Sequence, residues 1–237
     1  MKNRIFLSAL FMMVALLSPA QTQQNYQHYD YTLSYGIVKG GVASITTTTS
    51  SHDGRDISHT KIVGRTRGLI DKLYKVYDIF ESTYDANNYM PLQSIRDVHE
   101  GKHLQYESAD FIRSRNVVNS NLIGETTVEP DVRDLVSGLL MLCNLDYSQC
   151  NVGQVMSYNV YHEKKAFPIQ VKYKGIETIK VNKKKYRCYC VAPMVDPGDL
   201  FKEKEGLNMW IAADDTRRII FAKLNFSVGS FKLTIDE

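Results

Sequence analysis

The chain has 237 residues, with 29 lysine and arginine residues, 26 aspartate and glutamate residues and four cysteines. A formal net charge of +3 gives no electrostatic argument for a nucleic-acid partner, because such proteins carry a strongly basic face. The length suits one large β barrel or sandwich that can bury a core without disulfides.

The first twenty residues have the pattern of a secretory signal peptide. Lys2 and Arg4 form a short positive start, and the apolar run IFLSALFMMVALL follows them. Ser18 and Ala20 then place small residues where a signal peptidase reads the chain. The apolar run is short for a bilayer span, which disfavours the alternative of a retained anchor. We therefore predict a signal peptide at 1–20 and a single β-rich domain at 21–237.

This pattern predicts an exported protein of the periplasm or outer envelope. Gln21 rather than cysteine follows the expected cleavage site, so we expect no lipid at the new N-terminus. Loss of Lys2 and Arg4 leaves the remaining chain almost neutral. No later segment is apolar enough to span a membrane, so no transmembrane segment is expected after signal removal.

Alternation of apolar and polar residues is the main signal in the rest of the chain, and it predicts β-strands. The polar stretch 50–58 is expected to be a flexible connection. Glycines are expected to turn the chain at Gly40-Gly41 and at Gly229. The apolar faces, in chain order, are Tyr29, Tyr31, Leu33, Tyr35 and Ile37; Ile169, Val171 and Tyr173; Ile220, Ala222, Leu224 and Phe226; and Phe231, Leu233 and Ile235.

One segment, PDVRDLVSGLLMLCNL, has helical spacing instead. Pro130 precedes it, as a proline in a first helical turn would. Its apolar face must cover another surface, and the inner face of a sheet is the obvious partner. A second stretch, from Ile70 to Tyr77, fits a short helix or a strand. The apolar positions of the first segment are Val132, Leu135, Val136, Leu139, Leu140 and Cys143.

The stretch His99-Glu100-Gly101-Lys102-His103 matches the zinc-peptidase pattern H-E-x-x-H. That chemistry needs a helix, which places both histidines on one face. Gly101 disfavours a helix, and the flanking residues read as two short strands joined by a tight turn at Glu100-Gly101. A hairpin would place His99 opposite Lys102, and Glu125 or Glu129 is only a weakly defined third ligand. Zinc hydrolysis is therefore a remote alternative.

The four cysteines do not define a metal site. Cys188 and Cys190 would share one face of a strand, where core packing is the favoured interpretation. Cys143 and Cys150 bracket six residues after the predicted helix. A Cys143–Cys150 disulfide is plausible in an exported protein, and reduced thiols are the alternative. We predict no cofactor.

Two runs of charged residues are better explained as turns than as catalytic or anion-binding sites. Asp214 and Asp215 separate two apolar strands, where aspartate is common turn chemistry. The run 183–185 is expected to be a solvated turn, with contact to phosphate headgroups as a minor alternative. No nucleophile elbow, phosphate loop or dinucleotide fingerprint is present in the sequence.

Several stretches together resemble a known family: YGIVKGGVA, GRTRGLIDKLYKVYDIFESTYD, the proline at Pro91, VHEGK, and WIAADDTRRIIFAKL followed by GSFKL. Their order and spacing resemble exported bacterial proteins that carry the domain of unknown function 3108. The resemblance implies a mainly β (α+β) fold: a strongly curved antiparallel sheet forming a partial barrel, with one or two helices covering its concave face. This outline is similar to periplasmic lipoprotein carriers, which hold acyl chains between sheet and helix. The family has no assigned activity, so no catalytic residue follows from it.

These observations favour a non-catalytic protein that binds a lipid-like or other amphipathic small molecule in a half-barrel. The alternative is an envelope interaction or assembly protein that presents its curved sheet to a protein or glycan. A filled interior would favour that alternative, and packing in a core is the alternative for each lining residue. The predicted lining residues are Tyr31, Leu33, Tyr35, Leu135, Leu139 and Trp210.

Overall fold

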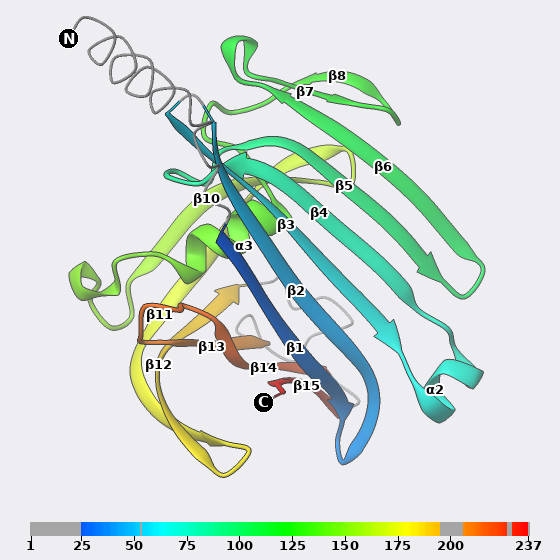
Figure 1. Cartoon of the computed structure of the whole chain (residues 1–237), viewed down its shortest axis with the longest axis vertical. Helices are drawn as coiled ribbons and strands as arrows, with labels where there is room; N and C mark the ends of the chain where they lie inside the picture. Colours follow the sequence, from blue (N-terminus) through cyan, green and yellow to red (C-terminus); the bar gives the residue numbers. More distant parts are fainter. Residues whose placement is uncertain (1–24, 53, 195–205, 227–228, 237) are drawn as a thin grey trace, which may run out of the picture.

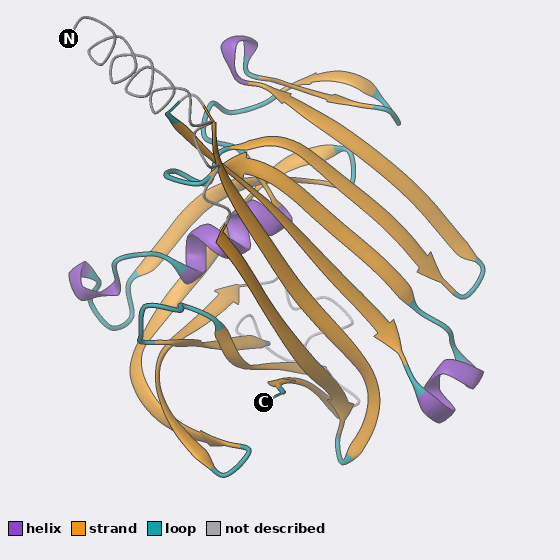
Figure 2. Ribbon diagram, in the orientation of Figure 1, coloured by secondary structure: helices purple, strands orange, loops and turns teal. Residues whose placement is uncertain are grey.

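The computed structural model describes residues 25–52, 54–194, 206–226 and 229–236. The predicted signal peptide at 1–20 lies outside the described residues. The strands form one continuous sheet in the order β8-β7-β6-β5-β4-β3-β2-β1-β15-β14-β13-β12-β11-β10-β9. Its two ends, β8 and β9, are edge strands, so the curved sheet stays open (Figure 2). The predicted mainly β partial barrel with covering helix is confirmed.

The element bounds show a long meander of antiparallel strands. The helices are α2 (Gly68–Leu73) and α3 (Leu135–Cys143), with 3-10 turns η2 (Arg113–Arg115) and η3 (Tyr147–Gln149). The strands are β1 (Asn25–Tyr35), β2 (Val38–His52), β3 (Arg55–Thr66), β4 (Tyr77–Asp85), β5 (Pro91–Glu100), β6 (His103–Ile112), β7 (Val117–Ser120), β8 (Gly124–Thr127), β9 (Arg133–Asp134), β10 (Val155–His162), β11 (Lys165–Val181), β12 (Lys184–Met194), β13 (Leu207–Ala212), β14 (Ile219–Phe226) and β15 (Gly229–Ile235).

The sheet can be divided into two halves along the strand order (Figure 1), and the side chains on their inner faces differ. We call β1 and β10–β15 the packed half, because they enclose most of the apolar core with α3. Tyr147 is a buried member of this core: its ring stacks on that of Tyr189 at 4.7 Å, and its hydroxyl donates to the Leu142 carbonyl oxygen at 2.6 Å. Other core members are Tyr31, Val171, Val191, Ile211 and Ile220.

We call β2–β8 the open half, and its inner face carries a row of hydroxyl groups. The register aligns Thr47, Thr60, Ser82 and Ser94 across β2 to β5. The hydroxyls of Thr47 and Thr60 lie 2.8 Å apart, and that of Thr60 lies 3.0 Å from the hydroxyl of Tyr84. Because these groups satisfy each other, they can be buried at little cost without forming an apolar core.

Side chains rather than backbone ladders join the two halves at the open edge. Asp134 caps α3 by accepting from the amide nitrogens of Val136 and Ser137, at 2.8 and 3.1 Å. Its other oxygen accepts from the Ser82 hydroxyl on β4 at 2.6 Å. Complete burial raises the pKa of the Asp134 carboxyl. A second contact links β6 to β10, where Glu107 accepts from the Tyr161 hydroxyl at 3.1 Å.

Several local predictions need correction. The first hairpin turns at Gly36–Ile37, whereas Gly40 and Gly41 lie within β2 at a bulge opposite β1. Residues 50–52 and 55–58 are paired β-structure of β2 and β3 rather than a flexible connection. Gly229 begins β15. The helix α3 begins at Leu135, because Asp134 caps it and the two residues before Leu135 form β9. The ambiguous stretch becomes α2, followed by the start of β4 at Tyr77.

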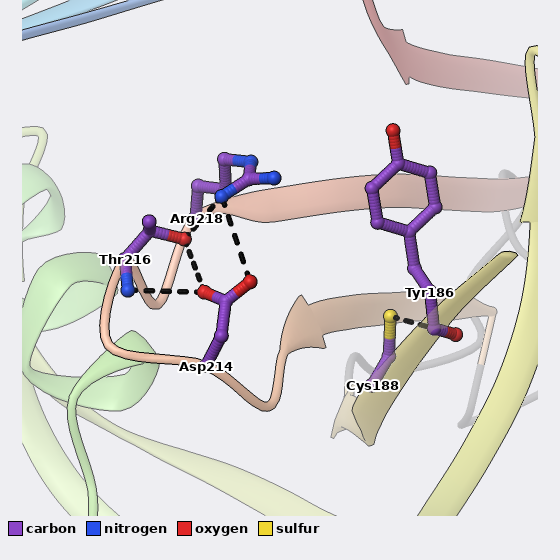
Figure 3. Close-up of polar contacts among 5 residues, drawn as sticks. All are labelled: Tyr186, Cys188, Asp214, Thr216 and Arg218. Carbon is purple, nitrogen blue, oxygen red and sulfur yellow. Dashed lines mark hydrogen bonds and ion pairs between the residues drawn. The ribbon is translucent and has the colours of Figure 1, made fainter. Parts of the chain in front are cut away.

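The predicted turn at Asp214–Asp215 is confirmed, and Figure 3 shows its contacts. The Asp214 carboxylate accepts from the Thr216 amide nitrogen at 3.0 Å and from the Thr216 hydroxyl, and lies 3.7 Å from Arg218 Nη1. These bonds lower the pKa of Asp214 although partial burial opposes them. The pair therefore stabilises a turn between β13 and β14. The turn predicted at 183–185 is found one residue earlier, at Asn182 and Lys183, and Lys184 and Lys185 begin β12.

Candidate ligand-binding site

The structure separates the six predicted lining residues. Leu33 and Tyr35 line one apolar groove at the end of the sheet near α2. Tyr31 and Leu139 pack in or against the core, and Leu135 lines a cavity of only about 30 Å³ at the start of α3. Trp210 does not line the groove: its ring packs against Phe221, and its Nε1 donates to Glu177 at 2.8 Å.

The apolar groove has a volume of about 590 Å³. Tyr31, Leu33 and Tyr35 alternate along β1, so all three face the inside of the sheet. The rings of Tyr35 and Phe231, from β1 and β15, lie 5.0 Å apart, and each residue is about 40% exposed. The lining residues are Leu33, Ser34, Tyr35, Val38, Gly40, Gly41, Gly64, Arg65, Thr66, Ile70, Val76, Asp78 and Phe231.

Glycines open the floor of this groove. Gly41 approaches β3 so closely that a Cβ there would lie 2.8 Å from the Arg65 carbonyl oxygen. A Cβ on Gly64 would meet nothing within 4 Å, so it would project into open space. Because neither residue carries a side chain, the surface between the apolar walls is hollow.

The short helix α2 forms one wall because β2 holds it in place. The Arg67 amide nitrogen donates to the Gly40 carbonyl oxygen at 2.8 Å. A Cβ on Gly40 would lie 3.0 Å from Ile70 Cγ1, which shows that Ile70 packs directly over the bare glycine. The Gly40-Gly41 bulge, predicted as a turn, therefore serves to seat α2 beside the groove.

A second groove, of about 680 Å³, borders the first at Arg65, Thr66 and Val76. We call it the basic groove. Arg65 and Tyr77 are register partners on β3 and β4, on the face of the sheet opposite to Gly64. Its lining residues are Arg65, Thr66, Arg67, Asp71, Lys75, Val76, Tyr77, His99, Gly101 and Leu104.

The H-E-x-x-H stretch forms a wall of the basic groove, and the predicted hairpin is confirmed. Its turn is Gly101–Lys102, one residue later than predicted, so Glu100 faces His103 and His99 faces Leu104 rather than Lys102. The two histidines therefore do not form the helical ligand pair that zinc hydrolysis requires. Within the described residues, no group of three or more candidate metal ligands is found.

The backbone conformation and the close packing at position 101 require a glycine in this turn. The φ of Gly101 is +61°, a conformation that favours glycine, and its amide nitrogen donates to the Lys75 carbonyl oxygen at 2.8 Å. A Cβ there would lie 2.9 Å from the Tyr74 ring. The turn thus holds the segment between α2 and β4 against β5 and β6.

All four cysteines are described, and all are free thiols. The Cys143–Cys150 disulfide left open by the sequence is therefore not formed in this structure. Cys188 and Cys190 share one face of β12 and are fully buried, as the core interpretation expects.

Sequence reasoning missed the cations of the basic groove. The signal was present, because Arg65, Arg67, Lys72 and Lys75 occur within eleven residues that contain one acid, Asp71. The small net charge of the whole chain concealed this local excess of positive charge. Only the structure shows that three of these side chains surround a groove.

Comparisons with known proteins were consistent with the fold. A family model for proteins of unknown function, DUF3108, matches residues 30–236. A comparison with curated proteins found no match. Among solved structures, the chain is similar to a β-barrel-like protein of the domain of unknown function DUF1849 from Brucella abortus, with a TM-score of 0.55 and 11% identity over 91% of this chain and 96% of that chain.

A DUF1089 family protein from Pseudomonas aeruginosa gives a TM-score of 0.34 at 8% identity, over 80% of this chain and 87% of that chain. This score carries no argument, and the first likeness shows the fold alone. In the part of the chain that the structure describes, no helix is long and apolar enough to cross a membrane.

Proposed function

The chain belongs to DUF3108, a family of proteins of unknown function, and from that premise we propose a non-catalytic binding protein that holds the hydrocarbon part of an amphiphile in the apolar groove. The observation that carries this proposal is the open apolar lining beside a filled core. Its volume of about 590 Å³ lies within the roughly 300–1,000 Å³ typical of ligand pockets.

The groove presents apolar side chains that the fold leaves partly in water. Leu33, Val38 and Ile70 form its aliphatic walls, with the paired rings of Tyr35 and Phe231 at one end. Exposed apolar area is unfavourable by roughly 25 cal/mol per Å², so a hydrocarbon chain that covers it gains binding free energy. The bare Gly41 and Gly64 let such a chain lie close to the backbone.

We further propose that the protein acts in the cell envelope after export. The support is the leader pattern of residues 1–20, with its positive start, apolar run and small residues at the expected cleavage site. Envelope compartments contain the amphiphiles that such a groove would take.

A second candidate function is an interaction or assembly protein. The filled packed half favours it, because α3 contacts both β4 and β10 and so occupies the space between the two halves where a lipid carrier would hold its cargo. The two candidates differ in whether the apolar groove takes a small molecule.

Native mass spectrometry of protein extracted gently from its own cells separates these candidates. We expect a bound mass in the lipid range on the wild-type protein. Gly64→Leu should abolish it, because the new side chain projects into the groove. Val63→Leu, on the opposite face of β3, is the matched control and should retain it. A bare polypeptide that also takes up no added dodecanoate would contradict the proposal and favour the interaction protein.

A further inference from the structure

We propose that the ligand of the apolar groove carries an anionic headgroup, which Arg65, Arg67 and Lys75 bind in the basic groove. This inference rests on the function proposed above and adds the charge class of the ligand. It commits to a single-chain amphiphile with a phosphate or carboxylate head.

The two grooves are placed to receive the two parts of one molecule. Arg65, Thr66 and Val76 line both of them, so they meet at the end of β3 and the start of β4. The apolar groove lies on the inner face of the sheet, and the basic groove lies on the opposite face, where Arg65 and Tyr77 project; the two grooves meet round the ends of β3 and β4 beside α2. An amphiphile whose chain lies over Gly64 would bring its head to Arg65.

The three cations have no anionic partner of their own. Among the described residues, no carboxylate lies within 4.0 Å of Arg65, Arg67 or Lys75, and their side chains make no hydrogen bond. Some cations elsewhere on the surface are paired, since Lys61 lies 2.8 Å from Glu81 and Arg115 lies 2.6 Å from Glu125, whereas others, such as Lys39, have no ion pair with a described residue. The cluster is distinguished by its arrangement, because its three cations line one groove that contains a single acid, Asp71, among its described lining residues.

The acids near the cluster are engaged with other groups. Asp71, the one acid that lines the basic groove, accepts from the Thr66 hydroxyl at 2.8 Å. Asp30 and Asp236 lie on the other side of Arg65 and Arg67 in a separate groove of about 420 Å³. The first lies 3.2 Å from His28, and the second accepts from Thr32 at 2.8 Å.

Guanidinium groups suit such a headgroup because they donate two parallel hydrogen bonds to a phosphate or carboxylate. Three like charges held together repel each other, and an anion between them removes that repulsion. A neutral or zwitterionic head gains little from this arrangement, so the cluster should select for net negative charge.

Calorimetric titration with two matched probes tests the inference. Dodecyl phosphate and dodecylphosphocholine share the chain and the phosphate, but choline cancels the net charge of the second. Below their micellar concentrations and at low salt, we expect dodecyl phosphate to bind roughly tenfold more tightly. Added salt should reduce this preference, because the cations are exposed.

Two triple variants test which cations produce the preference for dodecyl phosphate. The triple variant Arg65→Gln/Arg67→Gln/Lys75→Gln should lose the preference and still bind dodecylphosphocholine, which also shows that it is folded. The control is Lys183→Gln/Lys184→Gln/Lys185→Gln, which removes the same charge at the turn between β11 and β12. It should bind both probes as the wild type does.

The other outcomes overturn the inference in distinguishable ways. Equal binding of both probes would leave the apolar groove as the site and reject the anionic headgroup. Loss of the preference in the control triple variant would assign it to net charge. Displacement of dodecyl phosphate by equimolar inorganic phosphate would identify a site for the free anion. Binding only to anionic vesicles would indicate a membrane surface, and binding of neither probe would reject the proposed function itself.

Discussion

The packed half and the open half of the sheet use the same antiparallel pairing and reach different results. In the packed half, inward positions carry Val171, Val191 and Ile211, which close around α3 and Tyr147. In the open half, the inward row from Thr47 to Ser94 carries hydroxyls. Toward α2, the inward positions include glycines and half-exposed apolar side chains.

Alternation of apolar and polar residues therefore determines that a segment forms a strand, but it does not determine whether the inward side chains fill the interior. A curved sheet fills its own concave face only where inward side chains are large and apolar enough to meet a covering helix. Hydroxyls that bond to one another cover the inner face without filling the interior, and glycines on neighbouring strands leave a hollow. The groove follows from this change of inward composition along one continuous sheet.

The largest expected contrast comes from one substitution in the apolar core and one in the apolar groove. Leu142→Ala should lower the free energy of unfolding by about 2–5 kcal/mol, because it leaves a cavity in the packed core. Leu33→Ala should lower it by about 1 kcal/mol or less, because the groove already admits water there. Urea denaturation measures both. Equal losses would mean that the apolar groove is packed as tightly as the core.

Asp134 joins the two halves of the sheet, and its replacement by asparagine should cost less stability than its truncation to alanine. Asp134→Ala removes the cap of α3 and leaves the Ser82 hydroxyl unpaired, so it should cost about 2 kcal/mol. Asp134→Asn keeps a capping oxygen and should cost less than about 1 kcal/mol at acid pH.

The stabilities of the wild type and of Asp134→Asn should depend differently on pH. Burial raises the pKa of Asp134 above its ordinary value of 3.8. Ionisation is therefore easier in the unfolded chain, and the wild type loses stability as the pH rises from the ordinary aspartate range toward the raised pKa. Asp134→Asn lacks this loss, so its stability relative to the wild type should increase with pH. A constant difference would show that the carboxyl is not desolvated.

The glycines of the groove floor should respond with opposite signs. Gly41→Ala places a Cβ against the Arg65 carbonyl oxygen and should destabilise the protein by about 1–3 kcal/mol. Gly64→Ala meets no atom and should stabilise it by up to about 1 kcal/mol, since alanine restricts the unfolded chain. Thermal melting of both variants tests this. Destabilisation by both would mean that no hollow exists at Gly64.

The smallest effect concerns thiol reactivity and leaves stability unchanged. Burial raises the pKa of Cys143 and Cys190 to about 12 and that of Cys188 to about 11. At pH 8, iodoacetamide should therefore modify half-buried Cys150 first, and Cys150→Ser should remain unlabelled until unfolding. Mass spectrometry counts the labels. A Cys143–Cys150 disulfide in the isolated protein would contradict this pattern.

Local patterns predicted the elements well. Alternation at Tyr29 to Tyr35 and at Ile169 to Tyr173 located real strands, and helical spacing located α3. The glycine at 101 indicated a hairpin because glycine fits its turn conformation. The predicted resemblance to the DUF3108 family is confirmed by the match over 30–236, and it supplied the partial barrel that periodicity alone does not specify.

Features that depend on which strands pair, and in which register, could not be predicted from local sequence patterns. Leu33 and Tyr35 lie in a groove because β15 pairs with β1, a contact between segments about 200 residues apart. Gly40-Gly41 has turn composition, yet its bulge geometry follows from pairing with β1 and from the seat it gives Ile70. The inward side of α3 was apparent, but sequence alone did not show that Tyr147 would fill the space beside it.

Hydrogen–deuterium exchange with and without dodecyl phosphate tests the central claim most directly. If the apolar groove is the ligand site, protection should appear at 33–41, 64–77 and 230–235, which carry its walls. The core formed by α3 and β10–β12 should exchange at an unchanged rate. Protection centred on α3 and β10–β12 instead, or no protection in any segment, would contradict the account.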